Sequence, residues 1–458
     1  MPVSTQDSTS APQRQLLGPV RATVFIVSSM LGAGIFLLPS SLSRFGTIGI
    51  LALVVSGFGA LALGVSFGAL ASKLGSAAGP YGFAEDAFGR RVGFWTAWMF
   101  WLSAWTGTSA IVTVWVSYVG FLLPREMSTV EQLAVAAIGL FTPALINFAG
   151  ARAMSRAQSV ALLVSCIPIV ILVAVGPFSI TRDFLGPFNT SGQPALLAIA
   201  AALPVTVFVF VGVEAVAVLA DEIENPRRNV MRATVVGVLV CLVVYVLTTA
   251  VVMGTVAAED RRSGLCSFSL CMSYLFGTPL AGTLMAVAAV LAGFSGLVGW
   301  ALLSGEAPKS AAQDTMFPAV FARVTSRGVP MTGILLSQAM AAAVVLPVLL
   351  GGSGGLKVLD IVLSVAGIAA GVVFLVTVMA DIAETRKSGT GLSWPRRVGV
   401  VVALGFSVAV MVASSIEAVE HMQAVVVLLL WLAIGAVTLR LVDRRSPGDA
   451  PREAHAPR

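Results

Sequence analysis

The sequence predicts an all-α integral membrane protein with twelve transmembrane helices. Hydrophobic residues make up 57% of its 458 residues and charged residues only 11%, whereas a soluble domain usually carries roughly 25% charged residues. Long uncharged runs separate the charges, and twelve of them each hold a segment of the roughly 20 apolar residues that cross a bilayer. A soluble bundle of buried helices is the alternative, but no soluble core needs twelve apolar segments of this length.

The expected helices follow these uncharged runs, with an error of several residues at each boundary. They cover about 22–42, 47–72, 92–122, 131–149, 157–178, 195–220, 233–256, 278–305, 330–350, 356–380, 398–416 and 421–440. A single transmembrane domain over 18–441 is therefore expected between disordered tails at 1–17 and 442–458. The polar stretch around Cys266 to Ser273 is expected to belong to a loop.

Lys and Arg orient these helices, because cytoplasmic loops carry an excess of both. Twelve crossings place both termini on one side, and 22 of the 28 Lys and Arg residues fall on that side. Both termini are thus predicted to be cytoplasmic, in a multi-pass protein of the cell (inner) membrane. No basic segment leads into a short apolar stretch with a small-residue cleavage site, so the first helix is expected to remain in the mature protein.

Several classes of function lack their sequence signals. The net charge of +6 is explained by the Lys and Arg residues that set the predicted topology. Nucleic-acid binding is not predicted, because the sequence has no basic run interleaved with aromatic residues. The two histidines and four cysteines form no close group, so neither a metal site nor a cofactor is expected. No nucleophile–base pair predicts an enzyme. Cys266 and Cys271 share a predicted outer loop, where a disulfide is one interpretation and two free thiols the favoured one.

Two of the predicted helices contain glycine near their middle. Gly32 and Gly34 flank Ala33 in the first, and Gly212 lies in the sixth, five helices later. Glycine-interrupted helices at matching positions of two halves indicate a transporter site. The backbone N–H groups freed at such a break favour a carboxylate, and the freed carbonyls favour an ammonium. An amino acid carries both groups. The alternative for these glycines is close helix packing.

Glu214 is the one ionisable residue clearly inside a predicted span. An acidic group at bilayer depth is costly and usually faces a cavity and has a task. It could exchange protons near physiological pH or pair with a cationic substrate; a neutral carboxyl that hydrogen-bonds between helices is the alternative. Phe208 and Trp300 are candidate walls of the cavity, since an aromatic face can hold an aliphatic stem or a cation. Taken singly, each is more often a packing residue.

Four segments together resemble the amino acid–polyamine–organocation superfamily, above all its basic amino acid/polyamine antiporters of the arginine/agmatine type. The resemblance covers roughly residues 18–445. The segments that carry it are Gly-Ala-Gly-Ile-Phe at 32–36, Gly-Pro-Tyr at 79–81, Gly-Val-Glu at 212–214 with Glu-Asn-Pro-Arg-Arg-Asn-Val at 224–230, and Phe-Pro-Ala-Val-Phe-Ala-Arg-Val at 317–324.

The resemblance implies two inverted five-helix repeats, about 18–178 and 194–380, followed by two helices at about 397–441. It implies that the first and sixth helices are unwound in mid-membrane and hold the substrate there, and that Glu214 couples transport to protons. The substrate-binding residues it implies are Ser29, Gly32, Ala33, Gly34, Phe100, Thr108, Phe208, Val211, Trp300 and Ser364.

The implied function is secondary active transport by alternating access, in which a basic amino acid is exchanged for its decarboxylated amine or a polyamine. A proton-coupled carrier of a neutral amino acid is the second hypothesis, and a nutrient sensor or a subunit that needs a partner chain is the third. The expected partners are a small-molecule substrate and the lipid bilayer, and the resemblance allows a homodimer.

This chain departs from the arginine exchangers at four site positions. Ser29 and Thr108 stand where those proteins have asparagines, Phe208 replaces a tryptophan, and Phe100 replaces a tyrosine. Each change shrinks or removes a group around the far end of the substrate. The departures make arginine itself doubtful as the substrate and leave the backbone chemistry of the helix breaks unchanged.

Overall fold

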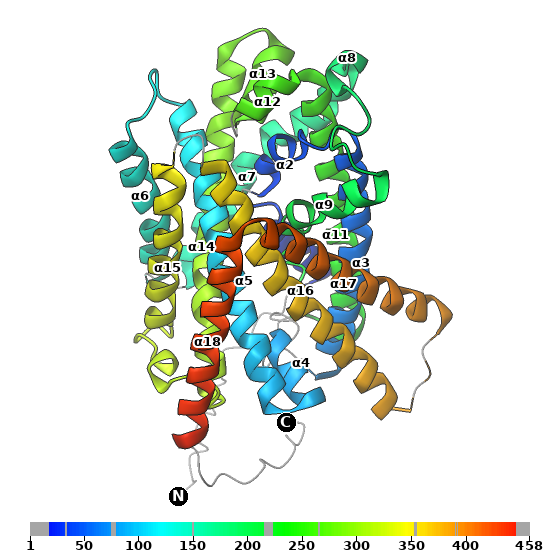
Figure 1. The fold of residues 1–458 in the computed structure, drawn as a ribbon, viewed down its shortest axis with the longest axis vertical. Coiled ribbons are helices and arrows are strands. Elements are labelled where there is room, and N and C mark those ends of the chain that lie inside the picture. The colour runs from blue at the N-terminus through cyan, green and yellow to red at the C-terminus, as the bar shows by residue number, and fades with distance from the viewer. Residues whose placement is uncertain are drawn as a thin grey trace, which may run out of the picture.

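The computed structural model describes residues 18–445 apart from residues 33, 75–78, 149–150, 215–222, 264–265, 352–354, 390 and 392. Every element assigned within this described part is a helix (Figure 1). Ten of these helices are long and apolar enough to cross a membrane. They are α3 (Ile48–Leu74), α5 (Arg90–Phe121), α6 (Thr129–Phe148), α7 (Ala151–Val175), α11 (Pro226–Thr255), α14 (Pro279–Gln313), α15 (Met331–Leu350), α16 (Gly355–Lys387), α17 (Trp394–Glu420) and α18 (Met422–Arg445).

The other two predicted segments, the first and the sixth, are not single continuous helices over the described residues. In the first, α1 (Pro19–Met30) ends before the described residues 31 and 32, and α2 (Gly34–Leu42) follows. In the sixth, α9 (Ala195–Phe208) is followed by turns through residue 214. Gly212 adopts φ +116° within these turns, a backbone conformation that residues other than glycine rarely adopt. The residue that marked the sixth helix in the sequence therefore lies where the helical path ends.

Shorter helices connect the spanning ones. They are α4 (Gly79–Phe88), η1 (Gly176–Ser179), α8 (Arg182–Leu185), α12 (Ala258–Ser263), α13 (Ser267–Phe276) and η3 (Ala319–Ala322). The prediction of a loop around Cys266 to Ser273 was wrong, because α13 occupies most of it. Phe268, Cys271 and Met272 of α13 are buried, so packing stabilises this segment as a helix although its serines suggested a loop.

One helix, α5, forms the centre of the bundle. Its apolar stretch is buried throughout, whereas α18 is mostly exposed, and α5 packs against both α14 and α16. The tryptophans of α5 join a buried aromatic cluster in which Trp98 stacks on Trp431 of α18, with the ring centroids 4.5 Å apart. The central position of α5 brings its small residues against the elements that follow the two interrupted helices.

The packing pairs recur between the first and second halves of the chain. The first interrupted helix (α1) packs on α11, and the sixth (α9) packs on α3. In the same way α7 packs on α14 while α16 packs on α5, and α6 packs on α14 while α15 packs on α5. In each of these pairs of contacts, one contact becomes the other when each helix is replaced by the predicted helix five positions away in the chain.

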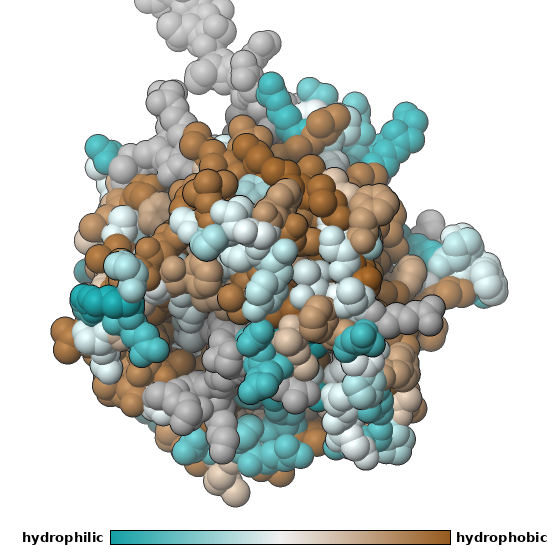
Figure 2. Space-filling view, turned by 90° about the horizontal axis from the view of Figure 1, so that it is seen from above, coloured by the Kyte–Doolittle hydropathy of each residue, from teal (hydrophilic) through white to brown (hydrophobic). Residues whose placement is uncertain are grey.

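The outside of the bundle is rich in large apolar side chains. Exposed Val, Leu, Ile and Phe residues are frequent on α6, α7, α17 and α18; at the end of the bundle seen from above, hydrophobic residues lie among hydrophilic ones (Figure 2). A soluble monomer rarely exposes contiguous apolar surface beyond a few hundred Å². Together with the ten spanning helices, this surface identifies a multi-pass membrane protein that is embedded in lipid.

Polar contacts tie the helices together at both ends of the bundle. At the end that holds α13, the Arg44 guanidinium pairs with Asp360 of α16 at 2.9 Å. At the end that holds α4, Arg396 of α17 pairs with Asp381 of α16 at 2.6 Å. Tyr81 of α4 donates a hydrogen bond to Asp314, directly after α14, at 3.0 Å. The two ion pairs fix α16 near both of its ends.

Close helix contact at Gly59 should be sensitive to any added side chain. A Cβ atom on Gly59 of α3 would overlap the ring of Phe406 on α17. We expect Gly59→Val to lower the thermal unfolding temperature in detergent, because overpacking costs about 1–3 kcal/mol. Gly405→Val is the matched control, since no atom lies within 4 Å of a Cβ atom at Gly405 of α17. Equal unfolding temperatures for the two variants would contradict the packing described.

Candidate functional site

The two interrupted helices meet where each of them stops. The Ser29 hydroxyl, near the end of α1, donates hydrogen bonds to the carbonyls of Ile26 at 2.8 Å and of Gly212 at 3.2 Å. A Cβ atom on Gly212 would lie only 2.8 Å from the Ser29 carbonyl oxygen. Glycine at position 212 therefore serves both the backbone conformation and the close approach of the two segments.

Tyr245 of α11 joins the same two helix ends. Its hydroxyl lies 2.6 Å from the Met30 carbonyl oxygen and 3.0 Å from the Val209 carbonyl oxygen. These carbonyls lie at the end of α1 and directly after α9, where a helix leaves its last carbonyls without partners. The sequence reasoning missed Tyr245. A signal was present, because a tyrosine buried in an apolar span usually needs a hydrogen-bond partner.

The carboxylate of Glu214 is turned back onto the break after α9. Its Oε2 accepts a hydrogen bond from the Gly212 N–H at 2.9 Å, and the residue is 2% exposed. This arrangement supplies a partner to an N–H group in the turns that follow α9. Glu214 does not line the central cavity described below, so in this structure its contact is with the backbone of the break.

A small cavity lies beside the break, between α5, α9, α14 and α16. It offers about 10 Å³, enough for one water molecule at most. Phe208, Val211 and Trp300, three of the predicted site residues, line it. The remaining lining residues are Ser103, Gly107, Pro204, Val207, Leu363, Ala366, Gly367 and Ala370. The sequence reasoning missed these eight, which are mostly small or apolar and carry no pattern that marks a site.

The ring of Phe208 stands between the first helix break and the wall of this cavity. A Cβ atom on Gly34 would lie 3.6 Å from Phe208 Cε1 and 3.3 Å from Val209 Cγ1. On the other edge of the ring, a Cβ atom on Gly107 would lie 3.5 Å from Phe208 Cε2. The glycines on both sides let the ring approach both backbones closely. Phe208 therefore separates the break at Gly34 from the rest of the cavity.

The other predicted site residues lie nearby and do not line the cavity. Phe100 and Thr108 are buried on α5, and Ser364 is buried on α16 beside Leu363. The hydroxyls of Thr108 and Ser364 donate to carbonyls of their own helices, at 2.9 and 2.8 Å. Gly32 is buried against α14, where its Cβ would lie 3.7 Å from Gly296 Cα. Ala33 lies outside the described residues.

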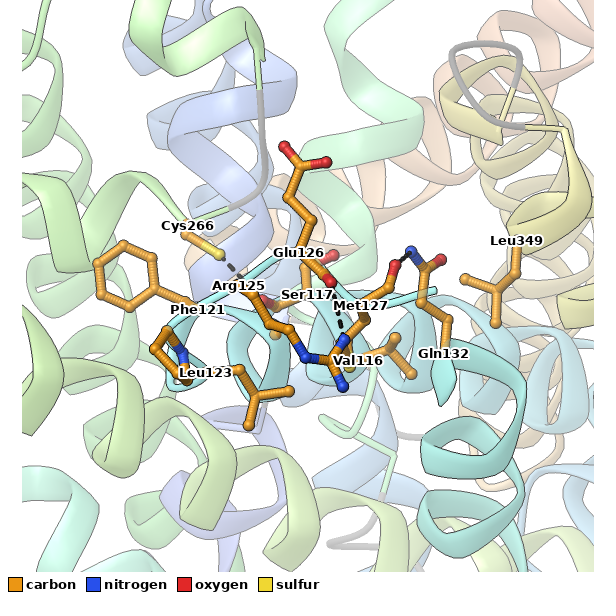
Figure 3. Close-up of a pocket in the computed structure, with 12 residues that line it drawn as sticks. Val116, Ser117, Phe121, Leu123, Arg125, Glu126, Met127, Gln132, Cys266 and Leu349 are labelled. Carbon is orange, nitrogen blue, oxygen red and sulfur yellow. Dashed lines mark hydrogen bonds between the residues drawn. The ribbon is translucent and has the colours of Figure 1, made fainter. Parts of the chain in front are cut away.

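A larger, open pocket of about 670 Å³ lies at the α13 end, away from the helix breaks (Figure 3). Two of its lining residues are charged: Arg125, which is paired with Glu131, and Glu126. The Cys266 thiol at its wall lies 3.3 Å from the Ser117 carbonyl oxygen. Burial raises the pKa of Cys266 to about 12, which keeps the thiol neutral. All four cysteines are free, including Cys271.

Comparison with known proteins identifies relatives of this chain. The model of the amino acid permease family matches residues 17–441. The putrescine transporter PotE of Escherichia coli (strain K12) is 30% identical over 321 residues, covering 70% of this chain and 73% of the relative. The cadaverine/lysine antiporter of the same strain is 29% identical over 356 residues, covering 77% and 79%. PotE of Haemophilus influenzae is 27% identical over 325 residues, covering 71% and 74%.

Tyr245→Phe should destabilise the junction of the two helix ends. The variant leaves two carbonyls without the shared hydroxyl donor, and a buried polar group that loses its partner costs about 1–3 kcal/mol. We expect a lower unfolding temperature in detergent than for Tyr118→Phe. Tyr118 is a comparably buried tyrosine, and the one backbone partner of its hydroxyl, Phe268, belongs to neither of the two helix ends. Equal effects of the two substitutions would argue against a bridging role for Tyr245.

Proposed function

We propose that this chain, which belongs to the amino acid permease family, exchanges an amino acid for an amine by alternating access. The protein is a secondary transporter and not an enzyme. One observation carries the proposal: two interrupted helices meet at their breaks beside a cavity. Freed backbone groups are tolerated inside a membrane where they line a cavity or meet a ligand.

The breaks offer complementary partners for the two ends of an amino-acid backbone. The N-terminal end of α2, which begins at Gly34, favours a carboxylate. The carbonyl-rich ends of α1 and α9 favour an ammonium. We propose that Ser29, Gly32, Ala33 and Gly34 hold the backbone of the substrate, with the remaining predicted residues around its side chain.

An amine and its parent amino acid share the ammonium and differ by the carboxylate. A site that binds the ammonium at carbonyl groups can therefore accept both, and the carboxylate subsite stays empty for the amine. The printed name of one relative pairs lysine with cadaverine, and that of another contains putrescine. These names support an amino acid/amine exchange for this chain.

We propose the full twelve-helix architecture with two inverted repeats. The first and sixth spans would each comprise two half-helices, which accounts for the ten continuous spanning helices. The recurring packing pairs support the repeat: a contact of α1 on α11 becomes a contact of α9 on α3 when each partner is replaced by its counterpart. An axis in the membrane plane that relates the two halves would produce this pattern.

The distribution of basic residues supports cytoplasmic termini. Arg90, Lys387 and Arg396, predicted to be cytoplasmic, all contact residues at the α4 end, where Lys387 donates to the Asp86 carbonyl at 3.0 Å. Arg44, predicted to be on the outer side, lies at the α13 end. Folding thus brings residues assigned to one side together, as the proposed orientation requires.

Exchange in liposomes tests the function directly. We expect purified protein in liposomes that are preloaded with unlabelled amino acids to take up labelled amino acid much faster than empty liposomes. Gly34→Val should abolish this uptake, because its side chain would press on Val209 and Phe208 and fill the space that a carboxylate needs. Gly405→Val, where the added side chain meets open space, is the control. Uptake that ignores the internal solute would contradict exchange.

Glu214→Gln tests the proposed proton coupling. Glutamine keeps an oxygen that can accept the Gly212 N–H and removes the titration. We expect exchange by the variant to be nearly flat between about pH 5 and about pH 8, the range in which intramembrane carboxyls serve proton transfer, while the wild type varies steeply. A variant with the wild-type pH profile would leave Glu214 as a structural acceptor only.

A further inference from the structure

The side chains that line the central cavity offer almost no hydrogen-bond acceptors. Of the eleven described residues that line it, only Ser103 carries a side-chain acceptor. Its hydroxyl already donates to the Phe100 carbonyl at 3.1 Å, so its lone pairs are what remain for a ligand. The Trp300 indole N–H can only donate. Ionisable side chains are absent from this set of lining residues.

A second positive charge on a substrate would be poorly matched by these walls. An ammonium group carries three donors and a guanidinium five, whereas Ser103 supplies the single side-chain oxygen among the described residues that line the cavity. The aromatic faces of Phe208 and Trp300 attract a cation, but this attraction is weaker than the hydration that a buried charge loses. An aliphatic or aromatic group, by contrast, gains from leaving water for such walls.

Phe208 connects this cavity to the proposed backbone subsite. Its ring lies in contact range of Gly34 on one edge and of Gly107 on the other. A substrate whose backbone lies at the first helix break would therefore extend its side chain past Phe208 toward Trp300, Leu363 and Ala366. The present volume of about 10 Å³ requires these side chains to move apart to admit it.

We infer that the cavity selects substrates with an uncharged, apolar side chain: an aliphatic or aromatic amino acid and the monoamine left when it loses its carboxylate. This inference rests on the proposed exchange function and concerns its side-chain subsite. The relatives' printed substrates lysine, cadaverine and putrescine carry a second amino group, and the walls of this cavity offer that group no charged partner.

Competition among exchange substrates tests the inference. Liposomes that are preloaded with unlabelled leucine should take up labelled leucine, phenylalanine and phenylethylamine with a kcat/KM at least about 100-fold above that for lysine or putrescine, which is about 2.8 kcal/mol at 1.4 kcal/mol per tenfold. Lysine or putrescine within tenfold of leucine would overturn the inference and leave the exchange function standing. No exchange of any of these compounds, whether the liposomes are preloaded with leucine or with lysine, would overturn both.

Ser103→Asp provides a gain-of-function test. A carboxylate in the cavity wall would pair with a distal ammonium, so we expect the lysine-to-leucine ratio of kcat/KM to rise at least about tenfold. Ser103→Asn is the control of similar size without charge, and its ratio should stay near that of the wild type. Gly107→Asp places the carboxylate at the edge of the Phe208 ring that faces away from Gly34. This variant should raise the ratio if Ser103→Asp does not fold. Equal ratios in the charged and uncharged variants would contradict the inference.

Discussion

The structure depends on one constraint: α1 and α9 both end inside the bundle, and the buried backbone groups that they leave free must find partners within the protein. Three side chains from different parts of the chain meet this need. Tyr245 lies within hydrogen-bonding distance of carbonyls of both helix ends, Ser29 reaches the Gly212 carbonyl, and Glu214 accepts the Gly212 N–H. The break is therefore held by side-chain contacts, long-range for Tyr245 and Ser29 and local for Glu214, rather than by helical hydrogen bonds. Because each such contact is far less cooperative than a helix, a ligand with its own donors and acceptors can compete with it.

Much of the fold could be predicted from local composition, because a membrane-spanning helix is recognised by the length of its uncharged run. The ten continuous helices follow the uncharged runs, and the two shorter ones are those that the glycines marked. The helix α13 could not be predicted in this way, because its serines are compatible with a loop and only burial against the bundle selects the helix. Within the site, Gly212 and Glu214 were visible as exceptions to the apolar pattern. Tyr245 was not singled out, because its role depends on two carbonyls that are distant in sequence.

The lining of the cavity was the least predictable part, for a physical reason. Ser103, Gly107 and Leu363 are ordinary residues of membrane helices, and only the packing of α5, α9, α14 and α16 gathers them around one space. Phe208, Val211 and Trp300, which the resemblance implied as site residues, line this space, whereas Thr108 and Ser364 direct their hydroxyls to carbonyls of their own helices. The lining of a site in a helix bundle depends on which helices pack together, and these tertiary contacts leave no pattern in the local sequence.

The geometry separates two tasks that a transporter must combine. In the exchange that we propose, recognition of the substrate backbone falls to main-chain groups at the breaks, which changes of side chain alter little. In the same proposal, discrimination among side chains falls to the cavity beyond Phe208, where the magnitudes of the interactions decide the outcome. A buried, unpaired ion costs several kcal/mol, and a cation–π contact returns about 0.5–2 kcal/mol. A single introduced carboxylate could therefore change the sign of that balance, while the helix breaks and the packing pairs around them stay intact. Proteins with one shared mechanism of exchange can in this way differ in what they carry.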